Sequence, residues 1–272
     1  MDFLNREQSP VAAELWRQID EATVSVARNV LTGRRFLHLN GPLGAGVDSV
    51  AVDDAETRSE VAVDGILTTK GRKLVQLPAL FEDFTLYARD LAQSEKAGIT
   101  PDLSAVLTAA QALALREDRL IYFGHAKLGY DGLLTAPGVN KLKKGDWSVG
   151  ENAFTDVAAA IETLTSKGVF GAYTLVVSPN LYLQMQRLQQ ALGMMEIDRV
   201  SKLVDGRLIK SPVLGKDQAI LLCAQPENVD LVIGQDIAAA YLEQRDLNHL
   251  FRLTETVLPR IKKAKAIVSI DK

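Results

Sequence analysis

The sequence predicts an α+β fold, in which helices and strands follow one another without the regular alternation of a doubly wound sheet. Three observations support this prediction. Some segments place apolar residues every three or four positions, as amphipathic helices do. Others are short β-like stretches separated by glycine, and the two kinds of segment occur in irregular order. No internal repeat of about 20–50 residues is visible, so a solenoid is not expected.

The composition is that of a globular chain with about two domains or one elaborated domain. Of the 272 residues, 47% are apolar and 24% are charged, and 31 basic residues nearly balance 34 acidic ones. Cys223 is the only cysteine, which excludes an intrachain disulfide and a cysteine-rich zinc site within one chain. The sequence shows neither a secretory signal nor an apolar run of about 20 residues, so we expect a cytoplasmic protein without a membrane partner.

The first expected element is a helix over about 10–32. Ser9 offers an N-cap oxygen, Pro10 suits the first helical position, and Gly33 provides a left-handed stop. Apolar residues recur along this segment every three or four positions. Because such a stripe must be buried, we expect the helix to dock on the rest of the protein.

An extended arm is expected next, over roughly 51–78. The β-like pieces in this part of the chain are 35–39, 61–63, 66–69 and 73–77. The pair Asp64-Gly65, flanked by apolar residues, predicts a hairpin turn. The arm has few bulky apolar residues and isolated hairpins are marginal in water, so we expect it to pack on a neighbouring chain.

The remaining elements alternate irregularly. Helices are predicted over 82–96, 103–124, 152–167, 179–191 and 196–205. Strands are predicted over 172–177, 207–209, 219–223, 231–233, 251–257 and 266–270. Asp102 or Ser104 would open the second of these helices, and Gly168 would end the third.

No combination of residues in the sequence predicts catalysis or metal binding. The histidines, His38, His125 and His249, lie in separate elements without a second metal ligand at helical or turn spacing. Cys223 lies in an apolar run, where a free cysteine behaves as a small hydrophobic side chain. Glu117 and Asp118 are adjacent on a helix and point in different directions. We therefore expect them to be solvated and ion-paired rather than to form an acid–base pair.

The glycine-rich and basic segments do not indicate phosphate or nucleic-acid binding either. Residues 41–46 contain three glycines, but a phosphate loop needs a helix directly after it, and the following residues look extended. Basic clusters at 141–144 and 260–265 lack interleaved aromatic residues, on which single-strand binders stack bases. We therefore expect no nucleic-acid partner.

Short fragments in a specific order run through almost the whole chain. They are 3–4, 16, 19–20, 33–36, 41–46, 84–86, 117–118, 121–124, 128–133, 171–178, 181–182, 234–236, 240–241, 254–256 and 260–261. In order and spacing they resemble the encapsulins, the shell proteins of bacterial and archaeal nanocompartments, also labelled linocin or bacteriocin.

The resemblance implies an HK97-type phage capsid fold, which is α+β in class. Its parts would be an N-terminal cargo-docking helix with the start of the peripheral domain (1–50), an E-loop (51–78), the peripheral domain with its spine helix (79–135), an axial domain (136–226) and a peripheral return (227–272). The turn expected at the five-fold pore consists of Leu192, Gly193, Met194, Met195 and Glu196.

The same resemblance implies that the protein functions by assembling into a closed shell and does not catalyse a reaction. Sixty identical copies, or a permitted multiple, would form an icosahedral shell. Cargo enzymes would be enclosed through a C-terminal targeting peptide bound in an interior apolar groove. The candidate groove residues are Leu31, Arg34, Leu37, Leu39, Leu231 and Ile233. A ferritin-like iron-storage protein is the first expected cargo, and a dye-decolourising peroxidase is the second.

No cofactor is expected. Some encapsulins carry a tryptophan associated with flavin in the stretch that matches 86–90, whereas this chain reads Leu-Tyr-Ala-Arg-Asp there. Two other classes of protein stay open: a phage major capsid protein that holds nucleic acid, and an enzyme such as the peptidase of older family labels. The enzyme would need a nucleophile–base pair that the sequence lacks. The early docking helix, without a long leader before it, favours the compartment shell.

Overall fold

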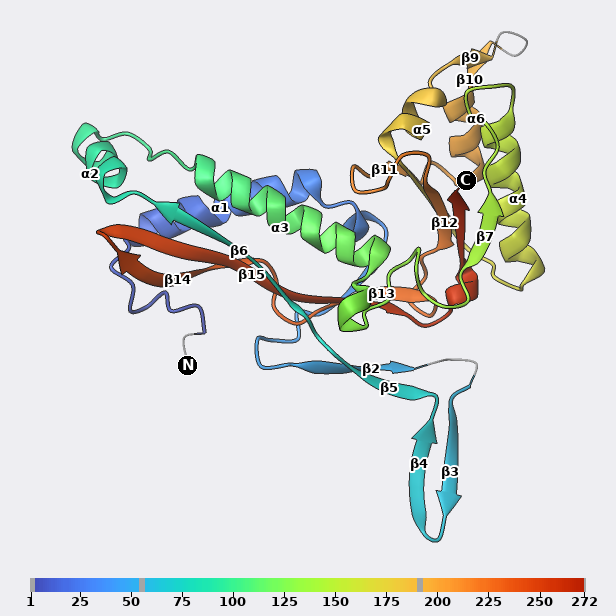
Figure 1. The fold of residues 1–272 in the computed structure, drawn as a ribbon, viewed down its shortest axis with the longest axis horizontal. Helices are drawn as coiled ribbons and strands as arrows, with labels where there is room; N and C mark the ends of the chain where they lie inside the picture. Colours follow the sequence, from blue (N-terminus) through green and yellow to red (C-terminus); the bar gives the residue numbers. More distant parts are fainter. Residues whose placement is uncertain (1–2, 54–56, 190–192, 272) are drawn as a thin grey trace.

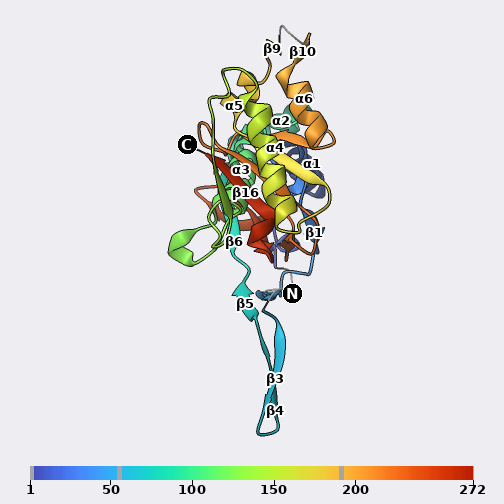
Figure 2. The ribbon, with the colours of Figure 1, turned by 90° about the vertical axis from the view of Figure 1, so that its right-hand side faces the viewer.

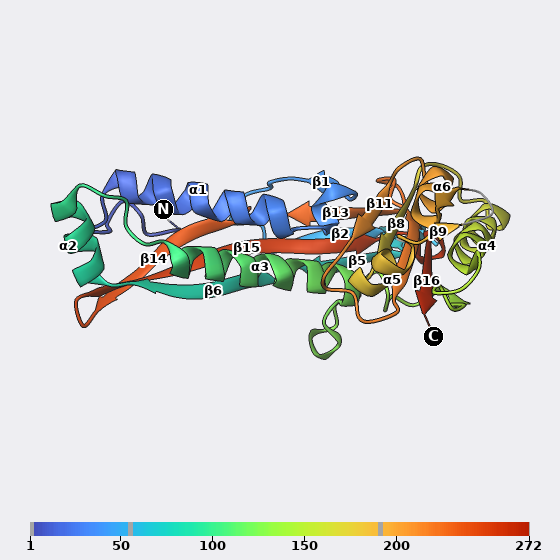
Figure 3. The same ribbon diagram turned by 90° about the horizontal axis from the view of Figure 1, so that it is seen from above.

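Two five-stranded sheets, each covered by helices, make up most of the computed structural model, and a narrow arm projects from them (Figure 1). The structure describes residues 3–53, 57–189 and 193–271. One sheet lies in an elongated limb and the other in a compact unit at the opposite end of the molecule (Figures 1 and 3).

The first sheet is organised around one long strand, β15 (Asn248–Ile261). Strands β13 (Val229–Ile233) and β14 (Ala238–Arg245) pair with it on one side and β6 (Ala79–Leu86) on the other, all antiparallel. Strand β1 (His38–Asn40) adds to β13 in parallel. Helices α1 (Ala13–Val30) and α3 (Ser104–Phe123) run along this sheet, and α2 (Ala88–Ala97) lies at its far end (Figure 3).

An aromatic core joins α1 and α3 to the first sheet. The ring of Trp16 meets Phe251 edge to face at 5.4 Å, and Phe84 stacks on Phe251 at 5.1 Å. Ile19 and Leu113 are fully buried beside them. The apolar stripe predicted for the first helix is therefore docked, as expected from its periodicity.

The second sheet has the strand order β11 (Leu208–Lys210), β8 (Tyr173–Val177), β12 (Ala219–Cys223), β16 (Ile267–Asp271) and β7 (Asn140–Lys143). The helices α4 (Asn152–Ser166), α5 (Pro179–Gln184) and α6 (Glu196–Leu203) belong to the same unit, together with the short pair β9 (Leu188–Gln189) and β10 (Met194–Met195). Every residue of β12 is buried, so this strand runs through the core. Short 3-10 turns occur at η1 (Gly33–Arg35), η2 (Ala126–Leu128) and η3 (Ala264–Ala266).

The arm consists of two antiparallel strand pairs. Strand β2 (Ser49–Asp53) pairs with β5 (Arg72–Gln76), and β3 (Ser59–Val63) pairs with β4 (Ile66–Lys70). Asp64 and Gly65 have φ values of 50° and 80°, which confirms the predicted two-residue turn. Figure 2 shows the hairpin of β3 and β4 extending well beyond the rest of the molecule. Its apolar side chains Val63, Ile66 and Leu67 are largely exposed in the subunit.

Two predicted helices are wrong in extent. Residues 82–86 belong to strand β6, and helix α2 begins only at Ala88. The cause is tertiary: Phe84 and Leu86 face the core while β6 pairs with β15, and this overrides the local helical tendency. The helix predicted over 179–191 ends at Gln184, and Leu188 begins strand β9. Strands β7 and β14 were missed by the sequence prediction.

The predicted signals at both ends of the first helix are also wrong. Helix α1 begins at Ala13, and Ser9 instead accepts a hydrogen bond from Trp16 Nε1 and donates one to the Arg6 carbonyl. Gly33 does not adopt a left-handed conformation but opens η1. A Cβ atom at Gly33 would lie 2.5 Å from Ile121 Cδ1, so a larger residue there would displace the end of this buried side chain of α3.

At Gly132 the backbone of the end of α3 lies so close that a larger residue is expected to lower the stability. A Cβ atom on Gly132 would lie 2.2 Å from the Gly124 nitrogen, at the end of α3. We expect Gly132→Ala to lower the free energy of unfolding by about 1–3 kcal/mol, the usual cost of overpacking. Thermal unfolding measures this, with Gly46→Ala as the control because a Cβ atom at Gly46 meets nothing within 4 Å. Equal midpoints for the two variants would contradict the expectation.

Candidate functional site

A pocket of about 420 Å³ opens where the last turns of α1 meet the loop between β13 and β14. The lining residues are Thr23, Val24, Ala27, Arg28, Leu31, Arg34, Arg35, Asp236 and Ile237. Val24, Ala27 and Leu31 share one face of the helix because they are three or four residues apart. Ile237 packs against the buried Ala27 and Leu31, and Val24 is 44% exposed. The pocket thus has an apolar floor and a charged rim.

Arg34 forms the inner wall of the pocket and is held by three carboxyl groups. Its Nη2 lies 2.8 Å from Glu117 Oε2 and 2.8 Å from Glu255 Oε2, and its Nη1 lies 2.7 Å from Asp236 Oδ1. The side chain of Arg34 is only 15% exposed, and those of Glu117 and Glu255 are 0% exposed. Residues from η1, α3, β15 and the β13–β14 loop are joined at this single guanidinium.

Asp118 fixes the end of α1 through a second buried network. Its carboxylate accepts hydrogen bonds from the backbone N–H groups of Thr32 and Gly33, both at 2.9 Å, and from the Thr32 hydroxyl at 2.7 Å. The same hydroxyl lies 2.9 Å from the Tyr122 hydroxyl and 3.1 Å from the Ser211 hydroxyl. Burial raises the pKa of Asp118, against the opposing effect of these hydrogen bonds. Because Ser211 directly follows β11, the network links the first sheet to the second.

The prediction that Glu117 and Asp118 lie on a solvated helix face is wrong, because both are fully buried. Its ion-pairing part is confirmed for Glu117. Sequence spacing gave no signal of this burial, since the partners Arg34 and Glu255 are far away along the chain.

The six predicted groove residues do not lie together in the structure: two line the pocket, and four lie elsewhere. Leu31 and Arg34 line the pocket. Leu37, Leu231 and Ile233 are buried together in the core between the two sheets, and Leu39 is exposed opposite Leu231 on the paired strand β1. The apolar pocket residues missed by the sequence analysis are Val24, Ala27 and Ile237. The helical spacing of Val24, Ala27 and Leu31 is a signal that could have identified two of them.

The predicted pore turn is partly described. Leu192 lies outside the described residues, whereas Gly193 has a φ of 63° and Met194 and Met195 form β10. Glu196 is fully buried at the start of α6, where its carboxylate lies 2.6 Å from Arg187 Nη2. The Met195 side chain is exposed. The position of this turn relative to a five-fold axis stays a prediction.

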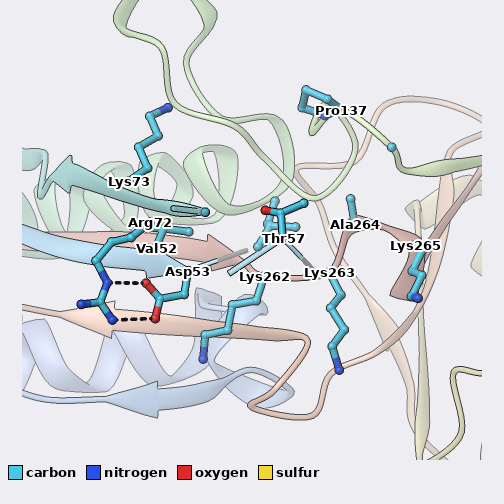
Figure 4. Close-up of a pocket in the computed structure, with 13 residues that line it drawn as sticks. Val52, Asp53, Thr57, Arg72, Lys73, Pro137, Lys262, Lys263, Ala264 and Lys265 are labelled. Atoms are coloured by element: carbon cyan, nitrogen blue, oxygen red, sulfur yellow. Dashed lines mark hydrogen bonds and ion pairs between the residues drawn. The ribbon is translucent and has the colours of Figure 1, made fainter. Parts of the chain in front are cut away.

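A second pocket, of about 570 Å³, lies at the base of the arm (Figure 4). Arg72 donates to both carboxylate oxygens of Asp53, at 2.7 and 2.9 Å, and hydrogen bonds from Arg72 and Arg58 hold the pKa of Asp53 well below its usual value. Figure 4 shows Lys73 on one side of the pocket and Lys262 and Lys263 on the other, with their ammonium groups directed apart. These lysines therefore do not converge on one ligand.

Some side chains of the basic cluster at 260–265 form ion pairs within the subunit. Arg260 and Lys262 bind the buried carboxylate of Asp230 at 2.5 and 2.8 Å. Burial tends to raise the pKa of Asp230, but the hydrogen bonds from both cations lower it below its usual value. Two members of the cluster thus stabilise β13 and β15.

The described residues contain no group of three or more His, Cys, Asp or Glu side chains placed to bind a metal ion. Cys223 is buried, which confirms its predicted environment, and burial raises the pKa of its thiol. Within the same ranges, none of the helices is both long and apolar enough to cross a bilayer.

Solved structures that share this fold are shells. A virus-like particle from Pyrococcus furiosus has a TM-score of 0.78 and 20% sequence identity, with 95% of this chain and 100% of that chain covered. The capsid of the Myoviridae phage XM1 has a TM-score of 0.61 and 14% identity, with 88% and 90% covered. At these identities the similarity shows the fold. The class is therefore the HK97-type capsid and shell fold, and the α+β prediction is confirmed.

Sequence comparisons define the family within this class. A family model described as "Encapsulating protein for peroxidase" matches residues 1–258. The "Type 1 encapsulin shell protein EncA" of Myxococcus xanthus is 36% identical over 277 residues, which cover 99% of this chain and 96% of the relative. The "Diheme-cytochrome-encapsulin shell fusion protein" of Kuenenia stuttgartiensis is 36% identical over 264 residues, which cover 95% and 73%. The chain belongs to this family of encapsulin shell proteins.

Family membership confirms the resemblance seen in the sequence. The protein is a structural, non-enzymatic shell protein whose assemblies contain many copies and enclose cargo. This assignment decides against both the phage capsid and the peptidase alternatives.

Proposed function

We propose that the pocket beside α1 binds the C-terminal targeting peptide of a cargo enzyme on the inner wall of a closed icosahedral shell. The observation that carries the proposal is the apolar floor formed by Val24, Ala27, Leu31 and Ile237 inside a pocket beside α1. An extended peptide gains specificity by placing side chains into such pockets. Many copies of the pocket on one shell raise the effective concentration for a multimeric cargo.

The proposed cargo is a ferritin-like iron-storage protein. A dye-decolourising peroxidase is the second candidate, and the description of the matching family model, which names peroxidase, favours it. The proposed shell has sixty copies or a permitted multiple of sixty, and we expect it to lie in the cytoplasm. No catalytic residue, metal ion or cofactor of the shell protein is needed for this function.

The proposed division into shell parts follows the two sheets. The arm at 51–78 would be the E-loop that packs on a neighbouring copy, because the apolar side chains of Val63, Ile66 and Leu67 near its tip are largely exposed in the subunit. The axial domain at 136–226 holds β7, β8, β11 and β12. The peripheral parts at 1–50, 79–135 and 227–272 hold the first sheet, although β16 of the last part completes the second sheet.

The pore turn is proposed to converge at the five-fold axis. Five copies of Met194 and Met195 would bury one another there, since soft apolar side chains gain from mutual burial. The ion pair of Arg187 with the buried Glu196 would brace the base of the turn.

A charge placed on the pocket floor tests the cargo site. Val24→Asp is expected to leave shell assembly unchanged and to reduce cargo loading at least about tenfold, because a carboxylate on the apolar floor opposes burial of an apolar side chain by more than 1.4 kcal/mol. The probes are a fluorescent protein fused to the C-terminal tail of a ferritin-like protein and one fused to that of a peroxidase. Loading is measured as fluorescence per purified shell.

The matched control for this test is Val149→Asp, which places the same charge at an exposed valine outside the pocket. It is expected to load cargo as the unmodified shell does. Equal loading of Val24→Asp and Val149→Asp shells would show that the pocket does not bind the tail.

A further inference from the structure

Two fully buried carboxyl groups face each other directly behind the cargo pocket. Glu117 comes from α3 and Glu255 from β15, and each places its Oε2 atom 2.8 Å from the same nitrogen, Arg34 Nη2. Neither side chain is exposed, so the two carboxyl groups meet at one guanidinium nitrogen without solvent between them. Two ionised carboxylates at such a site repel each other, and a proton on one of them removes the repulsion and can be donated to the other.

The surrounding charges do not compensate a second ionised carboxylate. Arg34 of η1 is the only cation bound to the pair in the described residues, and Asp236 of the β13–β14 loop already shares it. From α3, the next charged side chain is the buried Asp118, which is bound to Thr32 and Gly33. From β6, the residue opposite Glu255 is the apolar Leu80. Ionisation of both glutamates would leave buried negative charge without a partner.

One oxygen atom of this pair of carboxyl groups lacks a hydrogen-bond donor within the described part of the chain, and this favours a protonated glutamate. Glu255 Oε1 is buried and has no hydrogen-bond donor among the described residues. An ionised carboxylate with an unsatisfied buried oxygen would lose its hydration without replacement, which costs free energy. A protonated Glu255 that donates to Glu117 avoids most of this cost.

We propose that Glu117 and Glu255 share one proton, and that its loss in alkaline solution loosens η1 and the end of α1, which weakens peptide binding in the pocket. Two ionised carboxylates repel each other and draw water toward Arg34, the residue that joins the pocket wall to α3 and β15. The part that concerns the peptide rests on the function proposed above. The shared proton makes Glu255 a positioning residue for the pocket.

The direction of the pH dependence follows from thermodynamic linkage. Burial, together with the charge of Glu117 and the hydrogen bond to it, raises the pKa of Glu255 well above its ordinary value of 4.5, and Arg34 only partly opposes this. The folded state therefore holds a proton that the unfolded state releases. The stabilisation is complete below the ordinary pKa and is lost as the pH rises through the raised pKa of the folded protein.

Hydrogen–deuterium exchange on assembled shells tests the shared proton. Corrected for the intrinsic exchange rate, exchange in α1 and η1 is expected to increase at least about tenfold between about pH 6 and about pH 9.5, the ratio that one pKa unit of linkage produces. Exchange in α4, which belongs to the other sheet, is the internal reference. Glu255→Gln places a neutral donor beside Glu117 and is expected to abolish the increase.

Two further variants complete the experiment. Glu117→Gln leaves Glu255 as the one fully buried carboxyl group bound to Arg34 among the described residues and is also expected to abolish the increase. Glu82→Gln on β6 neutralises a partly exposed glutamate paired with Arg116 and is expected to behave as the unmodified shell does. An increase that persists in both Glu255→Gln and Glu117→Gln would overturn the proposal.

Binding of the labelled cargo tail at the two pH values separates this inference from the proposed function. The unmodified shell is expected to bind about tenfold more weakly at the higher pH, and Glu255→Gln to bind equally at both. Binding that is equally pH-dependent in both proteins overturns the link to the pocket. If neither binds the tail but Glu255→Gln still abolishes the exchange increase, the shared proton is supported and the cargo pocket is refuted.

Discussion

The double substitution Ile66→Asp and Leu67→Asp in the arm is expected to yield folded subunits that do not close into shells. The two residues are 71% and 64% exposed in the subunit, so their replacement removes little packing within it. Each apolar side chain of this size gains about 1.5–3 kcal/mol when it is fully buried. A carboxylate in the same place would add a desolvation cost, and every copy in the shell would suffer both losses.

Size-exclusion chromatography with light scattering, together with negative-stain microscopy, measures this outcome. The double variant is expected as subunits or small open assemblies, with a circular dichroism spectrum like that of the unmodified protein. Leu247→Asp is the control, because Leu247 is an exposed leucine with a φ of 68° at the β14–β15 turn, a conformation that aspartate tolerates. Closed particles of normal size from the double variant would show that the arm does not hold copies together.

Arg34→Met is expected to destabilise the subunit by about 3–5 kcal/mol, because removal of one partner from a buried ion pair leaves the other charge without compensation. Glu117 is fully buried and receives bidentate hydrogen bonds from Arg34, at 2.8 to 3.0 Å. Asp236 is more exposed and can be hydrated instead. The loss is therefore expected to come mainly from Glu117.

Denaturant unfolding measures the effect of Arg34→Met, and a compensating variant identifies its cause. Combining Arg34→Met with Glu117→Leu and Glu255→Leu removes the guanidinium and both buried carboxyl groups of this cluster together. The triple variant is expected to recover much of the lost stability. Arg35→Met is the control, because Arg35 donates only to backbone carbonyls of α1. If the triple variant were no more stable than Arg34→Met, uncompensated charge would not explain the loss.

Elements with local signals were predicted well. The turn at Asp64-Gly65 requires two residues with positive φ, and this pair adopts that conformation readily. Helix α4 begins at Asn152 and is followed by the left-handed Gly168, as the pattern of apolar residues and glycine indicates. Strand β12 consists only of apolar residues, so its burial is evident from composition. The order of family fragments supplied the fold class.

The functional geometry depends on contacts between residues that are distant along the chain. Strand β6 contains Glu82 and Asp83 and resembles a helix locally, but its pairing with β15 makes it a strand. Three of the six predicted groove residues are buried in the core, because Leu37 and strand β13 pack against α3 and the second sheet. The pocket itself needs Ile237 to approach α1 from the other end of the sequence.

Short-range chemistry, namely helical periodicity, turn residues and apolar runs, was enough to predict an α+β chain with an extended arm, and the resemblance of its ordered fragments to the encapsulins indicated a shell protein. The proton-sharing pair of Glu117 and Glu255 and the open pocket above it arise only after folding. A carboxyl group changes its protonation when burial and a second charge act on it together. That environment is created by the packing of α3 and β15 around Arg34, and no local sequence pattern encodes it.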